Sequence, residues 1–96
     1  MLDARLWIIV TMLVSDSRYP IKHYVSLYPR SRGNFFKAKA LLENDGIVSN
    51  LDDRRGYMDI DEHKALAFLE AEYPSLPDMI DNIKRARVAS ARRMKL

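Results

Sequence analysis

Side chains able to hydrogen-bond nucleic acid follow one another at residues 31–34 of this 96-residue chain. Arginine can bond guanine at two atoms and asparagine can do the same with adenine, so Arg32 and Asn34 are candidates for reading base edges. Gly33 would let the backbone approach a phosphate closely, and the start of a helix itself attracts anions. Ser31 suits the N-cap of that helix, and capping alone would also explain it. The chemistry predicted here is recognition of double-stranded DNA.

The basic residues around this segment have no acidic neighbours, since the sequence from Arg18 to Lys39 holds six basic residues and no acidic one. Such a run favours a surface that faces a polyanion, although ordinary solvated charge, for Arg32 and Lys37 included, would look the same. Phosphate contacts are expected from the flanking residues Arg18, Lys22, Arg30 and Lys39. Lys37 lies one turn beyond the predicted helix start and would join the base-reading residues.

Hydrophobic spacing predicts five helices and two short strands, which together make a mostly helical α+β chain. The helices are expected over residues 2–14, 21–28, 32–44, 62–73 and 79–91, and the strands over 47–51 and 57–60. One wide buried stripe is expected on the first helix, from Leu6, Ile9, Val10, Leu13 and Val14. The inner face of the third helix is expected to hold Phe35, Ala38 and Leu42 with Leu41 beside them. Expected helix ends are the caps Ser31, Asp61 and Asp78 and a left-handed Gly46.

This order of elements is that of a winged helix-turn-helix, because only the residues YPRS join the second and third helices. In that arrangement the third helix presents its first turn to the major groove of DNA. We therefore expect a DNA-binding domain over residues 1–73. The C-terminal helix and basic tail over residues 74–96 would serve dimerisation or contact with the DNA backbone.

The segment LLENDGIVSNLDDRRGYMDI resembles the MarR-type winged helix, whose helix end LE..GLV leads into a wing carrying D.R. The resemblance covers roughly residues 6–69. In that family the wing arginine reaches into the minor groove while the aspartate helps to hold the wing. The resemblance therefore implies that Asp53 braces the wing and that Arg55, or Arg54, enters the groove. A simple polar hairpin turn is the alternative interpretation of DDRRG.

The same resemblance implies a sequence-specific regulator of transcription, a repressor that binds double-stranded DNA as a homodimer. A full MarR-type protein begins with an additional helix that takes part in the dimer, whereas this sequence starts at or just before the helix that precedes the helix-turn-helix. It therefore looks like a reduced form of the family. A dimer would use the first helix, the helix that ends at Tyr73 or the last helix, and control by a small-molecule effector is not expected.

Phe36 is the residue that the pattern explains least, because adjacent Phe35 and Phe36 cannot both face inward on one helix. Phe36 would pack onto the second helix, meet a thymine methyl group in DNA, or lie against a protein partner. The last possibility belongs to an alternative function, a winged-helix protein-interaction module without sequence-specific DNA binding. Its apolar contact surface would consist of Phe36, Tyr19, Tyr28 and Trp7.

Enzymatic, metal-binding and membrane functions find no support in the sequence. The chain has no cysteine, and its two histidines, His23 and His63, are forty positions apart without a partner at catalytic or metal-ligand spacing. Three glycines cannot easily build a phosphate loop, so no enzyme activity, cofactor or metal is expected. The apolar run at residues 6–14 is too short to span a bilayer. We expect a cytoplasmic protein associated with the nucleoid.

Overall fold

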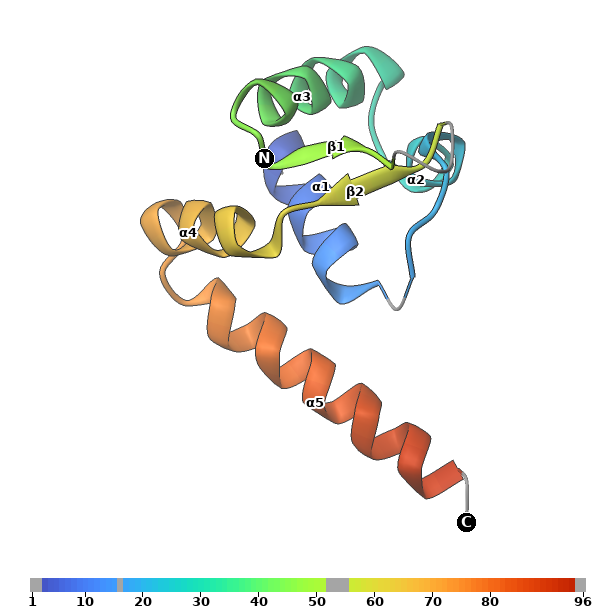
Figure 1. Ribbon diagram of the computed structural model, residues 1–96, viewed down its shortest axis with the longest axis vertical. Coiled ribbons are helices and arrows are strands. Elements are labelled where there is room, and N and C mark those ends of the chain that lie inside the picture. Colours follow the sequence, from blue (N-terminus) through green and yellow to red (C-terminus); the bar gives the residue numbers. More distant parts are fainter. Residues whose placement is uncertain (1–2, 16, 52–55, 95–96) are drawn as a thin grey trace.

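The computed structural model describes residues 3–15, 17–51 and 56–94, with side chains as far as residue 86. Five helices and a two-stranded antiparallel sheet make up this part of the chain, which confirms a mostly helical α+β fold (Figure 1). The elements are α1 (Ala4–Val14), α2 (Ile21–Leu27), α3 (Arg32–Asn44), β1 (Val48–Asn50), β2 (Met58–Ile60), α4 (Glu62–Glu72) and α5 (Leu76–Met94).

Short polar side chains begin three of the helices, because each accepts a hydrogen bond from a backbone N–H that the first turn leaves unpaired. The Asp3 carboxylate accepts from the Arg5 N–H at 2.9 Å. The Ser31 hydroxyl accepts from the Asn34 N–H at 3.4 Å, and the Asp61 carboxylate accepts from the Lys64 N–H at 3.1 Å. The predicted caps Ser31 and Asp61 are thus confirmed.

The last helix begins earlier than predicted, at Leu76 instead of Met79, so Asp78 lies inside its first turn and does not cap it. The sequence predicts a break over residues 74–78 instead. A proline in the first helical turn lacks an N–H that would have no partner there anyway, so Pro77 fits the helix without cost.

The two strands form a hairpin whose base is bonded to the segment that precedes α2. Val48 pairs with Ile60 and Asn50 pairs with Met58 in the antiparallel register. Beyond the strands, the Ile21 N–H donates to the Gly56 carbonyl at 2.8 Å, and the Met58 N–H donates to the Tyr19 carbonyl at 3.2 Å. The hairpin is therefore positioned by backbone hydrogen bonds against the start of α2.

The chain turns from α3 into β1 at Gly46, whose φ of 74° confirms the predicted left-handed position. The Ile47 N–H then donates to the Leu42 carbonyl at 2.9 Å and closes the end of α3. A side chain other than glycine would be strained at this φ. A Cβ at Gly46 would also lie 2.9 Å from the Lys64 ammonium nitrogen.

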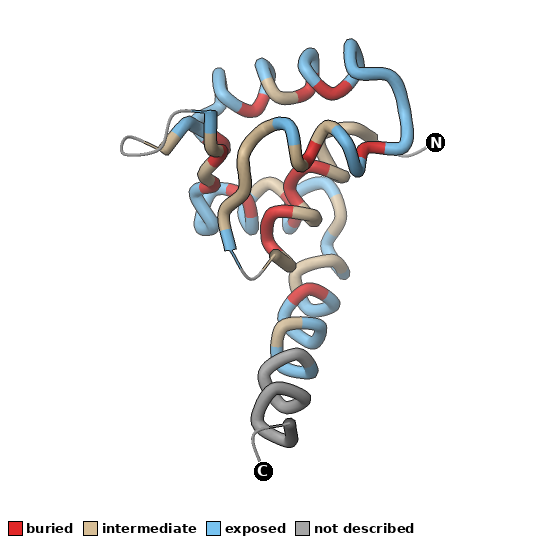
Figure 2. The backbone as a smooth tube through the Cα atoms, turned by 90° about the vertical axis from the view of Figure 1, so that its right-hand side faces the viewer, coloured by how far each residue is buried: buried red, intermediate tan, exposed pale blue. Residues whose placement is uncertain are grey.

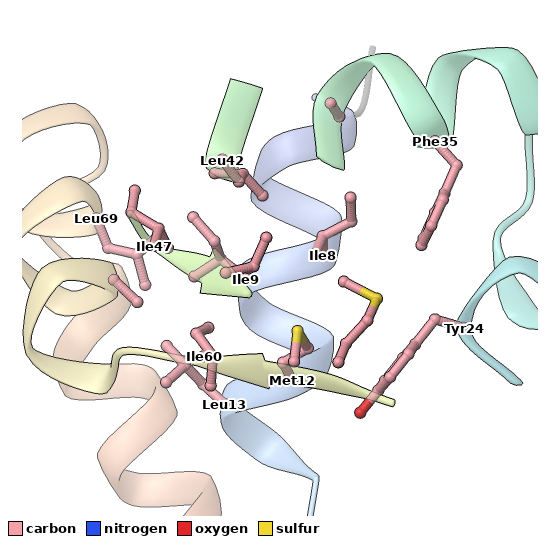
Figure 3. Packing of buried hydrophobic residues seen from close by; sticks show 14 of the residues in the cluster. Ile8, Ile9, Met12, Leu13, Tyr24, Phe35, Leu42, Ile47, Ile60 and Leu69 are labelled. Carbon is pink, nitrogen blue, oxygen red and sulfur yellow. The ribbon is translucent and has the colours of Figure 1, made fainter. Parts of the chain in front are cut away.

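Helix α1 is the centre of the core and packs against α3, α4, α5 and β2 (Figure 3). Its fully buried residues are Ile8, Ile9, Met12 and Leu13. The predicted stripe is therefore wrong in part, because Leu6, Val10 and Val14 are only half-buried. Residues 6–14 are apolar on almost every side except Thr11, so their spacing does not determine which side faces inward.

The inner face of α3 is confirmed for Phe35, Ala38 and Leu42, which are all buried. Leu41 was expected beside them, yet 51% of it is exposed. Residues 41 and 42 are adjacent on the helix and point about 100° apart, so burial of Leu42 directs Leu41 toward solvent. Buried residues gather around α1 and the hairpin, while α5 leads away from them after its anchor Ile80 (Figure 2).

The two adjacent phenylalanines offer a direct test of this packing. Replacing the fully buried Phe35 by alanine should lower the free energy of unfolding by about 3–5 kcal/mol, because it leaves a cavity beside α1. Phe36→Ala should cost about 1 kcal/mol, because 42% of Phe36 is already exposed. Urea unfolding followed by circular dichroism measures both, and equal losses would contradict the packing.

Candidate nucleic-acid interface

Helices α2 and α3 are separated only by residues 28–31, and a cluster of aromatic rings fixes their relative position. Tyr28 ends α2, and its N–H donates to the Tyr24 carbonyl at 3.0 Å. The Tyr28 ring is buried, with its centroid 5.1 Å from the Trp7 ring and 5.8 Å from the Phe35 ring. Because the three rings come from α1, the connection and α3, they hold the start of α3 in place.

The first turn of α3 is open to solvent. Ser31, Arg32, Gly33 and Asn34 are all exposed, and so is Lys37 one turn later. The Ser31 hydroxyl is occupied by its capping bond to the Asn34 N–H, so the capping interpretation of Ser31 is confirmed. No heavy atom outside the local chain lies within 4 Å of the place where a Cβ of Gly33 would be. A ligand could therefore approach the backbone closely at this turn.

Four exposed cations lie in or near this turn in the sequence and form no ion pair among the described residues: Lys22, Arg30, Arg32 and Lys37. Within the described ranges no carboxylate lies within ion-pair distance of any of them. Their charge is thus available to an external anion, as the acid-free sequence around them had suggested.

Two of the predicted phosphate contacts, Arg18 and Lys39, are instead bound within the chain. The Arg18 Nε donates to the Asp59 carboxylate at 2.9 Å, and its Nη2 lies 3.8 Å from Glu62. The Lys39 ammonium lies 2.6 Å from the Glu43 carboxylate one turn along α3. Each cation is partly neutralised by its partner, so Arg18 and Lys39 do not belong to the group of unpaired cations.

The Arg18–Asp59 pair connects the segment before α2 to strand β2. The hydrogen bond from Arg18 lowers the pKa of Asp59 below its usual value, and the Ile60 N–H acts in the same direction. Glu62 also lies 3.8 Å from the Lys84 ammonium nitrogen, which extends this group of charges to α5. Sequence reasoning missed the pair because 41 positions separate its members.

Phe36 lies beside α2, as one of its three interpretations predicted. It lines a hollow of about 440 Å³ together with Ile21, Lys22, Val25, Ser26 and Arg32. Its ring meets the Phe35 ring edge-on, with centroids 5.5 Å apart, and 42% of the residue stays exposed. The lining of the hollow therefore combines apolar side chains from α2 and α3 with two cations, Lys22 and Arg32.

The structure describes the two strands of the hairpin and the residues that flank its tip, Leu51 and Gly56. Asp53, Arg54 and Arg55 lie outside the described residues. The Leu51 N–H donates to the Tyr57 carbonyl at 3.0 Å, and Gly56 has a φ of 82°. The two residues that flank the tip are therefore positioned by backbone hydrogen bonds, since Leu51 is bonded to Tyr57 and Gly56 to Ile21 at the start of α2. The expected roles of these three residues stay predictions.

A second aromatic group at α2 was also missed by sequence reasoning. The Tyr19 ring stacks on the His23 ring, with centroids 4.2 Å apart and planes 25° apart. The Tyr24 hydroxyl accepts a hydrogen bond from the Tyr19 N–H at 3.3 Å, and burial raises the pKa of Tyr24. The i, i+4 spacing of Tyr19 and His23 is a weak local signal, because Tyr19 precedes the helix.

Neither a metal site nor a membrane span is found in the part of the chain that the structure describes. No three metal-ligating side chains gather there. No helix among these residues combines the length and the apolar character that crossing a bilayer requires. Comparison of the chain with protein-family models, curated proteins and solved structures finds no match. The function must therefore be argued from the residues themselves.

The Arg18–Asp59 pair predicts a pH-dependent stability. Because the pKa of folded Asp59 is lowered, its contribution is present above the ordinary aspartate pKa of about 3.9 and is lost as the pH falls through the folded value. Asp59→Asn should therefore cost roughly 0.2–1 kcal/mol at neutral pH, the usual range for a partly exposed pair, and less at acidic pH.

Urea unfolding at several pH values measures this difference, with Glu70→Gln as the control. Glu70 is an exposed carboxylate on α4 without an ion pair among the described residues. A cost of Asp59→Asn that stays constant with pH would contradict the role of this pair.

Proposed function

We propose that this protein is a sequence-specific regulator of transcription that binds double-stranded DNA through a winged helix-turn-helix. The observation that carries the proposal is the exposed first turn of α3, where Arg32, Gly33 and Asn34 face solvent and Arg32 has no ion pair among the described residues. The sequence resemblance to the MarR-type wing supports the same class. In this proposal the protein acts as a repressor and as a homodimer.

The first turn of α3 would enter the major groove. A helix of this width fits that groove, and helices that read DNA in this way contact the bases with residues of their N-terminal turns. Arg32 would bond a guanine and Asn34 an adenine, while Lys37 would reach the next step or a phosphate. The open space beside Gly33 and the helix N-terminus both favour an approaching phosphate oxygen.

Fewer residues would contact DNA phosphates in this proposal than the sequence alone suggests. Lys22 and Arg30 are exposed and unpaired among the described residues, so they would contribute most to the salt-dependent part of the affinity. Arg18 is held by Asp59 and mainly supports the fold. Lys39 could contact phosphate only by leaving Glu43.

The wing would complete the interface. Its base is bonded to the start of α2 and to the segment before it by the Ile21 and Met58 N–H groups. Arg55, or Arg54, would then enter the minor groove next to the major groove that α3 reads, since a narrow minor groove attracts arginine. Asp53 would brace the tip.

The competing proposal, a protein-interaction module, has one observation in its favour. The apolar lining of the hollow, from Phe36, Ile21 and Val25, could accept a hydrophobic side chain of a partner. Tyr28, however, is buried against Trp7 and Phe35, so it is not available for such a surface, while Trp7 is only half-buried. The free cations beside the hollow favour the DNA-binding proposal.

Removing the two base-reading side chains should relax the sequence preference. Arg32→Ala and Asn34→Ala should each weaken binding to a preferred duplex by roughly 1–3 kcal/mol while leaving binding to random duplex nearly unchanged. Competition between a preferred duplex, obtained by selection, and single-base variants of it measures the effect.

Lys64→Ala is the matched control for these variants. It removes one positive charge, but Lys64 lies beside Gly46 at the opposite end of α3. Equal effects of Lys64→Ala and Arg32→Ala, or no effect of Arg32→Ala on any duplex, would contradict the proposed interface.

The salt dependence of binding separates the two proposed functions. Affinity for random duplex DNA should fall steeply with added salt, and Lys22→Ala should reduce the slope of log K against log [salt] by about 1. Fluorescence anisotropy at increasing ionic strength measures this slope. An interaction module would instead show little affinity for random duplex even at low salt.

A further inference from the structure

A groove of about 350 Å³ lies between α4 and α5. Three apolar residues line it, Leu66 from α4 and Pro77 and Ile80 from α5. Ile80 is buried, whereas Leu66 is 37% exposed and is one of the large apolar side chains that reach solvent. The volume of the groove is in the range of small binding pockets, which are lined mainly by apolar side chains. The groove therefore offers an apolar contact to a ligand.

Both helices that form the groove are anchored in the core. Ala65 and Leu69 of α4 are fully buried, and so is Ile80 of α5. Only residues 73–75 join the two helices, and the Tyr73 N–H donates to the Leu69 carbonyl at 2.6 Å. The groove is therefore formed before a ligand arrives, which lowers the entropic cost of binding.

Four charged residues also line the groove, and two of them already have partners within the chain. The Lys84 ammonium nitrogen lies 3.8 Å from the Glu62 carboxylate. The Asp81 carboxylate lies 3.0 Å from the Arg85 guanidinium. These two residues are partly neutralised, so the charge left for a ligand comes from the other two.

Glu70 and Asp78 are the other two, and both are exposed carboxylates without an ion pair among the described residues. Asp78 lies in the first turn of α5, where negative charge favours the helix dipole, so the fold alone explains it. Glu70 lies near the end of α4, where negative charge is unfavourable and no basic residue of that turn compensates it. The fold gives no reason for a carboxylate at Glu70, whereas binding of a cation would.

We propose that this α4–α5 groove binds a short basic segment of a partner protein. An apolar side chain of the segment lies against Leu66, Pro77 and Ile80, and lysine or arginine side chains next to it in sequence reach Glu70 and Asp78. Hydrogen bonds between ionised groups are about twice as strong as neutral ones, and the long stems of lysine and arginine also pack on apolar surface. The apolar lining and the two free carboxylates are thus used by one class of ligand.

Other occupants fit this groove less well. From Asp59 to Asp81 the sequence holds seven acidic residues and one basic residue, Lys64. Such a surface would repel DNA or an acidic segment, and an uncharged apolar segment would bury the two carboxylates without partners.

The groove is also separate from the candidate nucleic-acid interface. Figure 1 shows α3 above the hairpin and α4 and α5 below it. The proposal therefore does not rest on DNA binding, so it can fail while the proposed function stands, and the reverse.

Selection of short random peptides displayed on phage, with the DNA-free full chain as the target, tests the class of ligand. The enriched peptides should carry lysine or arginine next to a large apolar residue. Glu70→Lys should then raise the dissociation constant of a synthetic copy of an enriched peptide at least about ten-fold, because like charges would meet in the groove. Fluorescence anisotropy measures this constant.

Glu72→Lys is the matched control for the charge reversal. Glu72 is an exposed carboxylate near the end of the same helix, but it does not line the groove. No enrichment, enriched peptides without basic residues, or equal effects of the two variants overturn the proposal.

The apolar contact is tested separately with the same peptide. Leu66→Ala should weaken binding about five-fold, because it removes apolar area that the peptide covers. Leu41→Ala should leave binding unchanged, since it shortens another exposed leucine that lies on α3. Circular dichroism shows whether each variant is folded. Equal effects of Leu66→Ala and Leu41→Ala overturn the proposal.

Sedimentation velocity separates a partner protein from a second copy of this chain as the occupant. Glu70→Lys should sediment like the unsubstituted protein at the same concentration. A lower state of association in the variant would assign the groove to self-association and overturn the proposal.

Discussion

The packing of three rings, from Trp7, Tyr28 and Phe35, is the interaction on which the rest of the structure depends. Trp7 belongs to α1, the central helix of the core, while Tyr28 ends α2 and Phe35 lies in the first turns of α3. Because the Tyr28 ring contacts both of the other rings, the short connection between α2 and α3 is anchored to the core. The exposed turn at Arg32 and Asn34 is therefore presented by a rigid base, as reading of base edges would require.

Ion pairs within the chain divide the basic residues into a paired group and an unpaired group. Arg18 is bound to Asp59 and connects the segment before α2 to the hairpin, while Lys39 is bound to Glu43 on α3. Lys22, Arg30 and Arg32 remain unpaired among the described residues. Carboxylates close to a cation compete with an external phosphate, so the number of intramolecular pairs would limit the electrostatic contribution to the proposed DNA binding.

Local features were predictable from the sequence, and long-range ones were not. Ser31, Asp61 and Gly46 could be assigned correctly because a cap or a left-handed turn depends on a few adjacent residues. The orientation of α1 could not, since apolar residues cover nearly all its sides and only packing against α3, α4 and α5 decides which are buried. The Arg18–Asp59 pair joins residues 41 positions apart, and spacing contains no signal for it. The early start of α5 was missed because the segment over residues 74–78, with its two prolines, was interpreted as a break.

The central claim is that the face formed by α2, the start of α3 and the hairpin binds double-stranded DNA. Backbone-amide NMR spectra of the protein during titration with duplex DNA test it most directly, because they report the contact surface residue by residue. The largest shifts are predicted at residues 31–37, with further shifts at the hairpin and at Lys22 in α2. Shifts confined to α1 and α5, or no shifts at low salt, would contradict the account.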